Sequence, residues 1–264
     1  MGKEKNNSVI NTSQPILECN GVTKRFGGLT AVNRVSLKVH HGEVIGLVGD
    51  NGAGKSTLIQ IISGVYSPDE GQIFVEGEKV AFSTPMDARN AGIETIYQDL
   101  ALATNLSAAD NIFLGREILK EKSKLFSFLD RKVMREEAKV ILKELDINIP
   151  GMDRPIRELS GGQRQAVAIS RSIYWNAKLL IMDEPTAALG VPEQRKVYEL
   201  VRKLKERNVP IIVISHNMND VFAVADRIIV LRRGKKVADV KAADTNDEEV
   251  VSWMVGKADD PAEE

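Results

Sequence analysis

The sequence has no long hydrophobic run, and this absence limits the class of protein. A helix that crosses a bilayer needs about 18 to 20 apolar residues, and no stretch of the chain approaches that length. The first residues, Met1 to Asn7, are polar and lack the apolar region of a secretion signal. We therefore expect a chain that is neither secreted nor membrane-spanning, and that serves a membrane only by docking onto a partner.

Cysteine and net charge are also scarce. Cys19 is the one cysteine, so no internal disulfide is possible, and we expect a small buried side chain in a reducing compartment. The 36 Lys and Arg residues almost balance the 37 Asp and Glu residues, which gives a formal net charge of -1. Such a balance creates no field toward nucleic acid or an anionic membrane, so we expect no nucleic-acid partner.

Apolar residues are present in short runs, and they make up 43% of the 264 residues, enough for one compact domain with a subdomain. Runs at 16–19, 35–39 and 73–75 predict strands of an antiparallel sheet near the N-terminus. Almost entirely apolar runs predict parallel strands that are covered on both faces. These runs lie at 44–48, 179–182 and 211–214, with weaker candidates at 93–97 and 227–231.

Helical spacing occurs between these strands. Apolar residues recur three and four positions apart at 134–145 and at 197–204, which marks one face of a helix in each segment. No clear strand pattern occurs from about Leu100 to Trp175. This region is therefore expected to be a helical subdomain inserted in an α/β core.

These patterns predict the domain organisation. We expect one domain at 15–256, with its core at 15–98 and 176–256 and its helical subdomain at about 99–175. The polar ends, 1–14 and 257–264, are expected to be flexible tails.

A glycine-rich loop follows the apolar run at 44–48. Glycines let backbone N–H groups wrap a polyphosphate closely, and Lys55 supplies the charge that the β and γ phosphates need. The Ser56 hydroxyl is suited to Mg²⁺. A chance glycine-rich turn is the alternative, but the strand-to-helix context favours a phosphate loop. The residues expected to bind the nucleotide are Gly49, Asp50, Asn51, Gly52, Ala53, Gly54, Lys55, Ser56 and Thr57.

A pair of carboxylates ends a second apolar run. Asp183 and Glu184 directly follow the run at 179–182. In a sheet with a phosphate loop, this arrangement places Asp183 beside the metal and makes Glu184 the candidate general base. Such a pair is often only a solvated turn, but the phosphate loop favours function. The two motifs together predict a Mg²⁺-dependent nucleoside triphosphatase.

A second anion site is indicated between the two motifs. Leu159, Ser160, Gly161, Gly162 and Gln163 lead into a helical segment, and a serine with two glycines at a helix start can bind an anion. One nucleotide does not need two such cradles within one subunit. The second is therefore expected to cover the γ-phosphate held by another subunit, which predicts a dimer.

From about Ile16 to Gly256 the chain resembles the nucleotide-binding subunits of ATP-binding cassette transporters, whose signature sequence is matched by the stretch from Leu159 to Gln163. The resemblance implies an α/β fold: a P-loop NTPase (RecA-like) parallel-sheet core with an N-terminal antiparallel β subdomain and an inserted α-helical subdomain. It also implies ATP and Mg²⁺ as cofactors, with Ser56, Gln98 and Asp183 at the metal. ATP would be hydrolysed in a head-to-tail dimer, with each signature sequence on the partner's ATP.

The resemblance assigns roles to three further residues. Gln98 matches the glutamine that senses the metal and the attacking water, and His216 matches the switch histidine that contacts the γ-phosphate. With Glu184 they form the expected catalytic set. Phe26 resembles the aromatic residue that stacks on adenine. The alternatives are a surface glutamine, a structural histidine and a core aromatic side chain.

One position departs from the family pattern. After Glu184, Pro185 and Thr186 the family usually has Ser-Ala-Leu-Asp, whereas residues 187–190 of this chain are Ala-Ala-Leu-Gly. Gly190 therefore replaces a carboxylate that helps to link the two sites of the dimer. Either the link between the sites is looser here, or the loop needs a glycine with positive φ.

Within the family, the chain resembles importer subunits. It carries one cassette, no fused membrane span and no long coiled coil. Segments 92–98, 109–117, 184–191 and 214–218 look like the monosaccharide uptake group of ribose, xylose and fructose systems, with the single-cassette fructose type as the nearest likeness. The implied partners are a second copy of the chain, membrane permease subunits and, indirectly, a sugar-binding protein, with the chain peripheral to the cytoplasmic face of the membrane.

Two other functions stay open on the sequence. One is a soluble ATPase of the same family that acts outside transport, and the other is a weakly hydrolysing regulatory module. For the importer, permease docking is expected at Leu100, Leu102, Leu106 and Phe113, for which core packing is an equally good interpretation.

Overall fold

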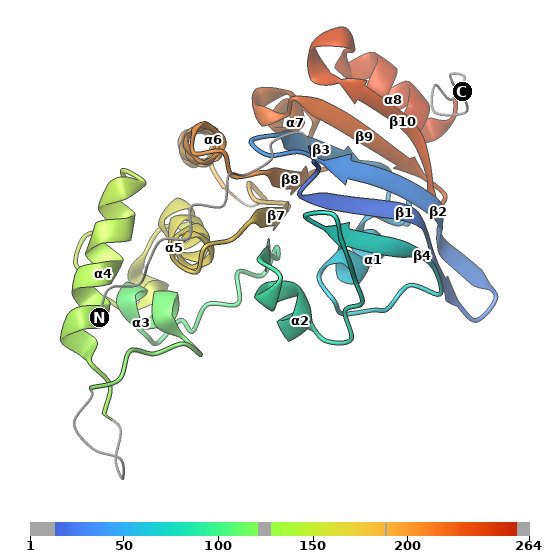
Figure 1. The fold of residues 1–264 in the computed structure, drawn as a ribbon. Coiled ribbons are helices and arrows are strands. Elements are labelled where there is room, and N and C mark those ends of the chain that lie inside the picture. The colour runs from blue at the N-terminus through green and yellow to red at the C-terminus, as the bar shows by residue number, and fades with distance from the viewer. Residues whose placement is uncertain (1–13, 121–127, 188, 258–264) are drawn as a thin grey trace.

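Two sheets form the framework of the computed structural model, which describes residues 14–120, 128–187 and 189–257 (Figure 1). The predicted tails thus lie outside the described residues, apart from Gln14 and Lys257. The smaller sheet has the strand order β2-β1-β4-β5 and its pairs are antiparallel, as predicted. Its strands are β1 (Leu17–Phe26), β2 (Leu29–Val39), β4 (Glu70–Val75) and β5 (Glu78–Val80).

The larger sheet has the order β10-β9-β3-β8-β7-β6. Its five predicted strands are parallel to one another, which confirms the expectation from the apolar runs. They are β3 (Val44–Val48), β6 (Ile93–Ile96), β7 (Leu179–Asp183), β8 (Ile211–Ile214) and β9 (Arg227–Arg232). The sequence analysis missed β10 (Lys235–Lys241), an antiparallel edge strand whose charged residues hide its alternation.

Alternate residues of the buried strands face different cores. Leu179 and Ile181 of β7 face the core between the two sheets, where Cys19 is also buried. Leu180 and Met182 face the helices on the other side. Helix α1 (Lys55–Ile62) lies between the sheets, with four of its eight residues buried. Burial thus fixes α1, and with it the loop that precedes it, against both sheets.

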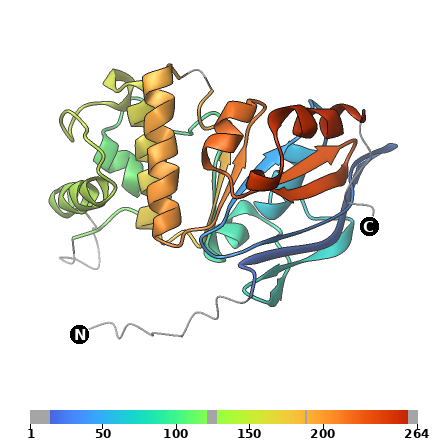
Figure 2. The same ribbon diagram turned by 90° about the horizontal axis from the view of Figure 1, so that it is seen from above.

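The helices form two groups (Figures 1 and 2). Near the sheets lie α1, α2 (Pro85–Asn90), α7 (Met218–Val224), η2 (Ala242–Asp244) and α8 (Asp247–Val255). The helical part contains α3 (Ala108–Phe113), α4 (Arg131–Glu144), η1 (Ile156–Glu158) and α5 (Gly161–Tyr174). Helix α6 (Val191–Glu206) packs against α5 and α7 and so joins the two groups. Short α2 and α8 were not anticipated from the sequence.

The helical part confirms a strand-poor segment between 100 and 175. In its described residues, β structure is limited to two isolated bridges, Ser107 with Pro155 and Leu119 with Leu129. Phe113 is fully buried, and its ring meets those of Tyr174 and Trp175 at centroid distances of 4.7 and 6.0 Å. The expectation that Phe113 docks onto a permease is therefore wrong for this residue, because its side chain belongs to the core.

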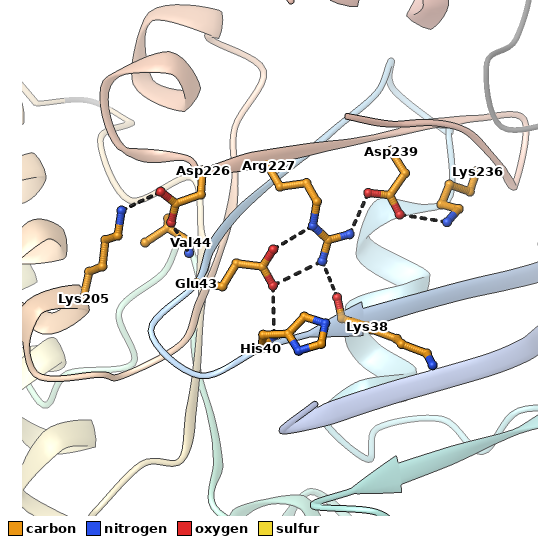
Figure 3. Close-up of polar contacts among 9 residues, drawn as sticks. All are labelled: Lys38, His40, Glu43, Val44, Lys205, Asp226, Arg227, Lys236 and Asp239. Atoms are coloured by element: carbon orange, nitrogen blue, oxygen red, sulfur yellow. Dashed lines mark hydrogen bonds and ion pairs between the residues drawn. The ribbon is translucent and has the colours of Figure 1, made fainter. Parts of the chain in front are cut away.

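A polar network fixes the end of the large sheet that lies opposite the glycine-rich loop (Figure 3). Arg227, at the start of β9, donates to Glu43 at 2.7 Å, to Asp239 at 2.6 Å and to the carbonyl of Lys38 at 2.5 Å. Burial alone would lower the pKa of Arg227, but hydrogen bonds to these carboxylates raise it above its usual value. The network ties β2, β3, β9 and β10 together.

Candidate nucleotide site

The predicted site residues leave the large sheet at one edge. Strand β8 pairs with β3 and β7, so Ile214 lies beside both Leu47 and Asp183. Strand β6 pairs with β7, with Ile96 beside Met182. The loops that follow these parallel strands therefore emerge together at their carboxyl ends, where open α/β sheets bind ligands.

The glycine-rich loop is held by close backbone approaches. Gly54 has a φ of 104°, and a Cβ there would lie 2.5 Å from the Ala31 carbonyl oxygen. A Cβ on Gly49 would lie 2.3 Å from the Leu231 carbonyl oxygen. The N–H of Gly234 donates to the Ala53 carbonyl at 2.9 Å. Contacts with β2, with the end of β9 and with the β9–β10 turn thus fix the backbone of the loop. The loop leads directly into the N-terminus of α1, whose first N–H groups have no partner within the helix.

Lys55 is the cation of this loop. Its ammonium donates to the carbonyls of Gly49 at 2.6 Å and of Asp50 at 3.1 Å. Burial lowers the pKa of Lys55, while the charges of Glu184, Asp50 and Asp183 act in the opposite direction. The lysine therefore sits in the field of the predicted carboxylate pair. Ser56 and Thr57 follow in the first turn of α1, where Ser56 is exposed.

The carboxylate pair lies at the end of β7. Burial and the charge of Glu184 raise the pKa of Asp183, and Lys55 only partly opposes them. Two acidic side chains thus share one nearby lysine, and a cation is the natural complement of that arrangement. Mg²⁺ uses one or two protein oxygens together with substrate phosphates. The hydroxyl of Ser56 and the carboxylate of Asp183 fit that donor type, and no cluster of three metal-binding side chains occurs in the described residues.

Glu184 and His216 are in contact. The backbone N–H of His216 donates to the Glu184 carboxylate at 3.0 Å, and its Nδ1 lies 2.7 Å from the same oxygen. The Glu184 side chain is 15% exposed, whereas that of His216 is 72% exposed. A half-enclosed carboxylate beside an accessible imidazole can hold and pass on a proton from a water molecule.

Gln98 and Phe26 lie at the rim. Gln98 is exposed and stands two residues beyond β6, at the same sheet edge. Phe26 ends β1, is 41% exposed and meets the ring of Tyr66 edge-on at 5.2 Å. The core alternative for Phe26 is therefore wrong. Its exposed face leaves stacking on a base as the prediction to test.

The second predicted anion cradle opens α5. Ser160 is the N-cap: its hydroxyl accepts from the N–H of Gln163 at 3.4 Å, and the Gln163 side chain accepts from the N–H of Ser160 at 3.0 Å. The Leu159 side chain is buried in the helical core. A Cβ on Gly161 would lie 2.5 Å from Leu189, and one on Gly162 would lie 3.3 Å from the Glu193 Cβ on α6. The Ser160 hydroxyl and the nearby backbone N–H groups lower the pKa of Glu193.

The structure does not join this cradle to the phosphate loop. Both views place α5 among the helices at one side of the molecule and α1 with the two sheets at the other (Figures 1 and 2). The two predicted anion sites of one chain therefore lie in different parts of the molecule.

Gly190 does not have the backbone that would demand a glycine. Its φ is -70° and its ψ is 158°, so the expectation of a positive φ is wrong. A Cβ there would meet only the Pro192 Cδ, at 3.8 Å. Gly190 is the N-cap of α6 and provides no side-chain cap. The neighbouring Ala188 lies outside the described residues.

Sequence reasoning missed the polar residues behind Glu184. Asp220 on α7 is 3% exposed and accepts hydrogen bonds from Thr186, Tyr198, Ser215 and Asn217. The only signal in the sequence is an acidic residue one helical turn after His216. Without the fold, nothing marks it as buried.

The strand order, the phosphate loop and the carboxylate pair at one sheet edge define a phosphate-loop nucleoside triphosphatase with an inserted helical part. More particularly, the chain belongs to the ABC transporter family, whose model matches residues 32–187. It is an ATPase cassette of that family. None of the helices in the described residues is long and apolar enough to cross a membrane.

Several known proteins are similar over nearly the whole chain. A xylose/arabinose import ATP-binding protein of Sulfolobus acidocaldarius is 50% identical over 92% of this chain and 95% of its own length. A fructose import ATP-binding protein of Rhizobium meliloti is 47% identical over 95% of this chain and 97% of its own. A ribose import ATP-binding protein of Caldanaerobacter subterraneus is 41% identical, but this chain covers 48% of it.

Solved structures give the same assignment. The ADP form of an ATP-binding cassette of an ABC transporter aligns with a TM-score of 0.77 and 27% identity, over 92% of this chain and 95% of that one. A dimeric bacterial ABC transporter cassette aligns with a TM-score of 0.69 and 27% identity, over 86% and 98%. The predicted α/β fold of a phosphate-loop triphosphatase is thereby confirmed.

Proposed function

We propose that the chain is the ATP-binding subunit of a sugar importer, which hydrolyses ATP to ADP and phosphate to drive uptake of a monosaccharide. The observation that carries this proposal is the identity of 47 to 50% with xylose/arabinose and fructose import ATP-binding proteins along almost their full lengths. The sugar would meet the permease and a sugar-binding protein rather than this chain, so the cassette supplies the energy and not the sugar specificity.

The site residues act on ATP in this proposal. The N–H groups at the start of α1 and the ammonium of Lys55 bind the phosphates, and Phe26 stacks on the adenine. Ser56 and Asp183, with Gln98 nearby, would hold Mg²⁺, which neutralises charge on the phosphates when bound. Glu184 accepts a proton from the attacking water, and His216 contacts the γ-phosphate.

Two copies complete the site. The cradle of Ser160 to Gln163 binds the ATP of the other copy, so two chains close head to tail around two nucleotides and open after hydrolysis. The dimer acts on permease subunits at the cytoplasmic face of the membrane, where the chain is peripheral. A solved cassette of the family forms a dimer, which supports this arrangement.

The test compares two preparations for ATP hydrolysis. One is the purified chain alone, and the other is the chain co-expressed with a candidate permease and then reconstituted with it in liposomes. We expect hydrolysis to require Mg²⁺ and to rise when a monosaccharide and its binding protein are added, with sugar accumulating inside. Full activity without a permease would favour an ATPase outside transport. ATP binding without turnover in either preparation would favour a regulatory module.

A further inference from the structure

A buried carboxylate lies directly behind Glu184 and His216. Asp220, on α7, accepts hydrogen bonds from the Ser215 hydroxyl at 3.1 Å and the Asn217 amide at 3.2 Å, and from the hydroxyls of Thr186 and Tyr198. Asp220 is 3% exposed, Thr186 3% and Ser215 fully buried. Taking a carboxylate out of water is costly, and the four donors offset that cost.

The donors come from three separate elements. Thr186 belongs to the loop after β7, two residues beyond Glu184, and Ser215 lies directly after β8 and directly before His216. Tyr198 lies on α6, and burial, together with its hydrogen bond to Asp220, raises its pKa. An apolar side chain on α7 could fill the same space without any need for donors. Instead, the Asp220 carboxylate connects Thr186, which lies near Glu184 in the chain, with Ser215, which directly precedes His216.

Glu184 needs such support because its backbone is strained. Its φ of 50° lies in the left-handed region, which disfavours residues with a Cβ. Its N–H donates to Ile214 at 2.9 Å, and its carbonyl accepts from Ala187 at 3.1 Å. The Thr186 hydroxyl anchors the same turn to α7 through Asp220. Strain of this kind persists only where the surroundings hold it, and it is concentrated at functional sites.

We propose that Asp220 is a positioning residue for hydrolysis: through Thr186 and Ser215 it holds Glu184 in its left-handed backbone and against His216. Asp220 does not touch the nucleotide in this proposal. It acts by fixing where the Glu184 carboxylate points, and its link to Tyr198 ties that placement to α6. The inference rests on the role proposed above for Glu184.

Thr186 gives the sharpest test. Thr186→Val removes the hydroxyl while keeping the shape of the side chain, and Thr186→Ser keeps the hydroxyl. We expect Thr186→Val to lower kcat roughly tenfold or more, with the affinity for ATP within about twofold of the parent, because the lost bond is to a buried charge. Thr186→Ser should recover most of the rate. Rates are divided by the amount of bound nucleotide, so that unfolded protein does not lower the apparent kcat.

A matched control and a second background separate positioning from folding. Thr245→Val removes a hydroxyl that donates to Glu249 at 2.7 Å on the exposed surface, and it should leave kcat unchanged. In Glu184→Gln protein, Thr186→Val should cause no further loss in single-turnover hydrolysis, because the group that it places is gone. If Thr186→Val does not fold, Tyr198→Phe removes another donor to the same carboxylate and repeats the comparison.

Each outcome of these measurements either supports or overturns the positioning role of Asp220. A normal kcat in Thr186→Val, a parallel loss of ATP affinity, or an equal loss in the Glu184→Gln background would overturn the positioning role while leaving the proposed function intact. A normal rate in Glu184→Gln alone would show that Glu184 is not the base. The role proposed for Glu184 and the inference about Asp220 would then fall together.

Discussion

At the scale of single residues, the candidate site is dominated by unbalanced charge. Asp183 and Glu184 share the field of Lys55, and burial raises the pKa of Asp183. The folded state therefore holds a proton on Asp183 more tightly than the unfolded chain does. The stability contributed by protonated Asp183 is fully present below about pH 3.8, the ordinary value, and is lost as the pH rises through the folded pKa.

Asp183→Asn removes the ionised form of this side chain. At pH 7 we expect the nucleotide-free variant to melt roughly 1 to 3 °C above the parent protein, and we expect this gain to vanish in acid. The same variant should lose Mg²⁺-dependent ATP hydrolysis, because a neutral amide is a poorer Mg²⁺ ligand than a carboxylate. Thermal melts across pH, with and without Mg²⁺ and ATP, measure both effects. A lower melting temperature at pH 7 would contradict the charge argument.

Gly190 allows a second residue-scale prediction. Because its φ is -70° and the space is open, neither Ala nor Asp should strain the loop. Gly190→Asp can accept from the N–H of Glu193 as an N-cap of α6, so we expect a change of less than about 1 kcal/mol in the free energy of unfolding. Gly190→Ala should be slightly less stable than Gly190→Asp.

The same two variants test the coupling between sites. A carboxylate at 190 should raise the Hill coefficient of ATP hydrolysis if it restores the link that the family pattern carries, and the Ala variant should not. Equal Hill coefficients in all three proteins would remove the coupling role of this position.

At the residue scale, the sequence could predict where a side chain lies when its motif has a short, fixed spacing. Lys55 and the Asp183–Glu184 pair are placed by the strands that precede them, so a strand pattern suffices to bring them to one edge. Asp220 could not be found in this way, because its partners lie on three elements whose packing one sequence does not show. The φ of Gly190 was also beyond reach, since glycine is compatible with every backbone region.

At the scale of elements, two helices begin with a serine cap in the same way. The Ser160 hydroxyl caps α5 and the Ser107 hydroxyl caps α3. Replacing either serine by alanine should cost about 1 kcal/mol of stability. Only Ser160→Ala should also weaken ATP-dependent association, because Ser160 lies in the proposed cradle for the partner's ATP. Chemical denaturation and size-exclusion chromatography with ATP separate the two effects, and equal association in both variants would contradict the cradle.

The network around Arg227 provides a prediction for the large sheet (Figure 3). The Arg227 side chain is 19% exposed, and its partners Glu43 and Asp239 are 15% and 21% exposed. Arg227→Met should lower the free energy of unfolding by about 2 kcal/mol or more, because two partly buried carboxylates lose their partner.

The matched control is Arg207→Met. Arg207 pairs with Glu144 on the surface, where the two side chains are 40% and 52% exposed, so its loss should cost less than about 1 kcal/mol. Both variants should hydrolyse ATP normally below their melting temperatures, since neither residue lies at the phosphate-loop edge. Equal costs in urea denaturation would show that burial does not set the strength of the Arg227 network.

The sequence predicted an element well when that element is completely buried, and poorly when it lies at an edge. Strands β3, β7 and β8 are covered on both faces and read as continuous apolar runs, whereas β10 lies at an edge and carries charges between its apolar residues. Leu100 and Leu102 are half-buried against the helical core, and Phe113 lies wholly within it. One sequence cannot separate an apolar face that packs internally from one that receives a partner.

At the scale of the whole molecule, the chain carries two helix starts that we propose to bind the phosphates of different nucleotides. The start of α1 follows the phosphate loop, while that of α5 lies among the helices. The fold around each was accessible from the sequence, because both are short motifs in a strand-to-helix or loop-to-helix context. The sequence analysis inferred that they serve different nucleotides because one nucleotide does not need two phosphate cradles. The structure shows the two helix starts apart (Figures 1 and 2).

That separation has a genetic consequence. Lys55→Ala damages only the phosphate loop and Gly162→Asp only the second cradle, so each homodimer contains two defective composite sites. A mixed dimer contains one site with both defects and one with none, formed by the intact loop of one chain and the intact cradle of the other. Two inactive alleles expressed together should therefore complement each other and restore up to a quarter of the parent ATPase rate, since random pairing makes about half the dimers mixed. Absence of complementation, with mixed dimers confirmed by tandem affinity tags, would mean that both cradles serve the same chain.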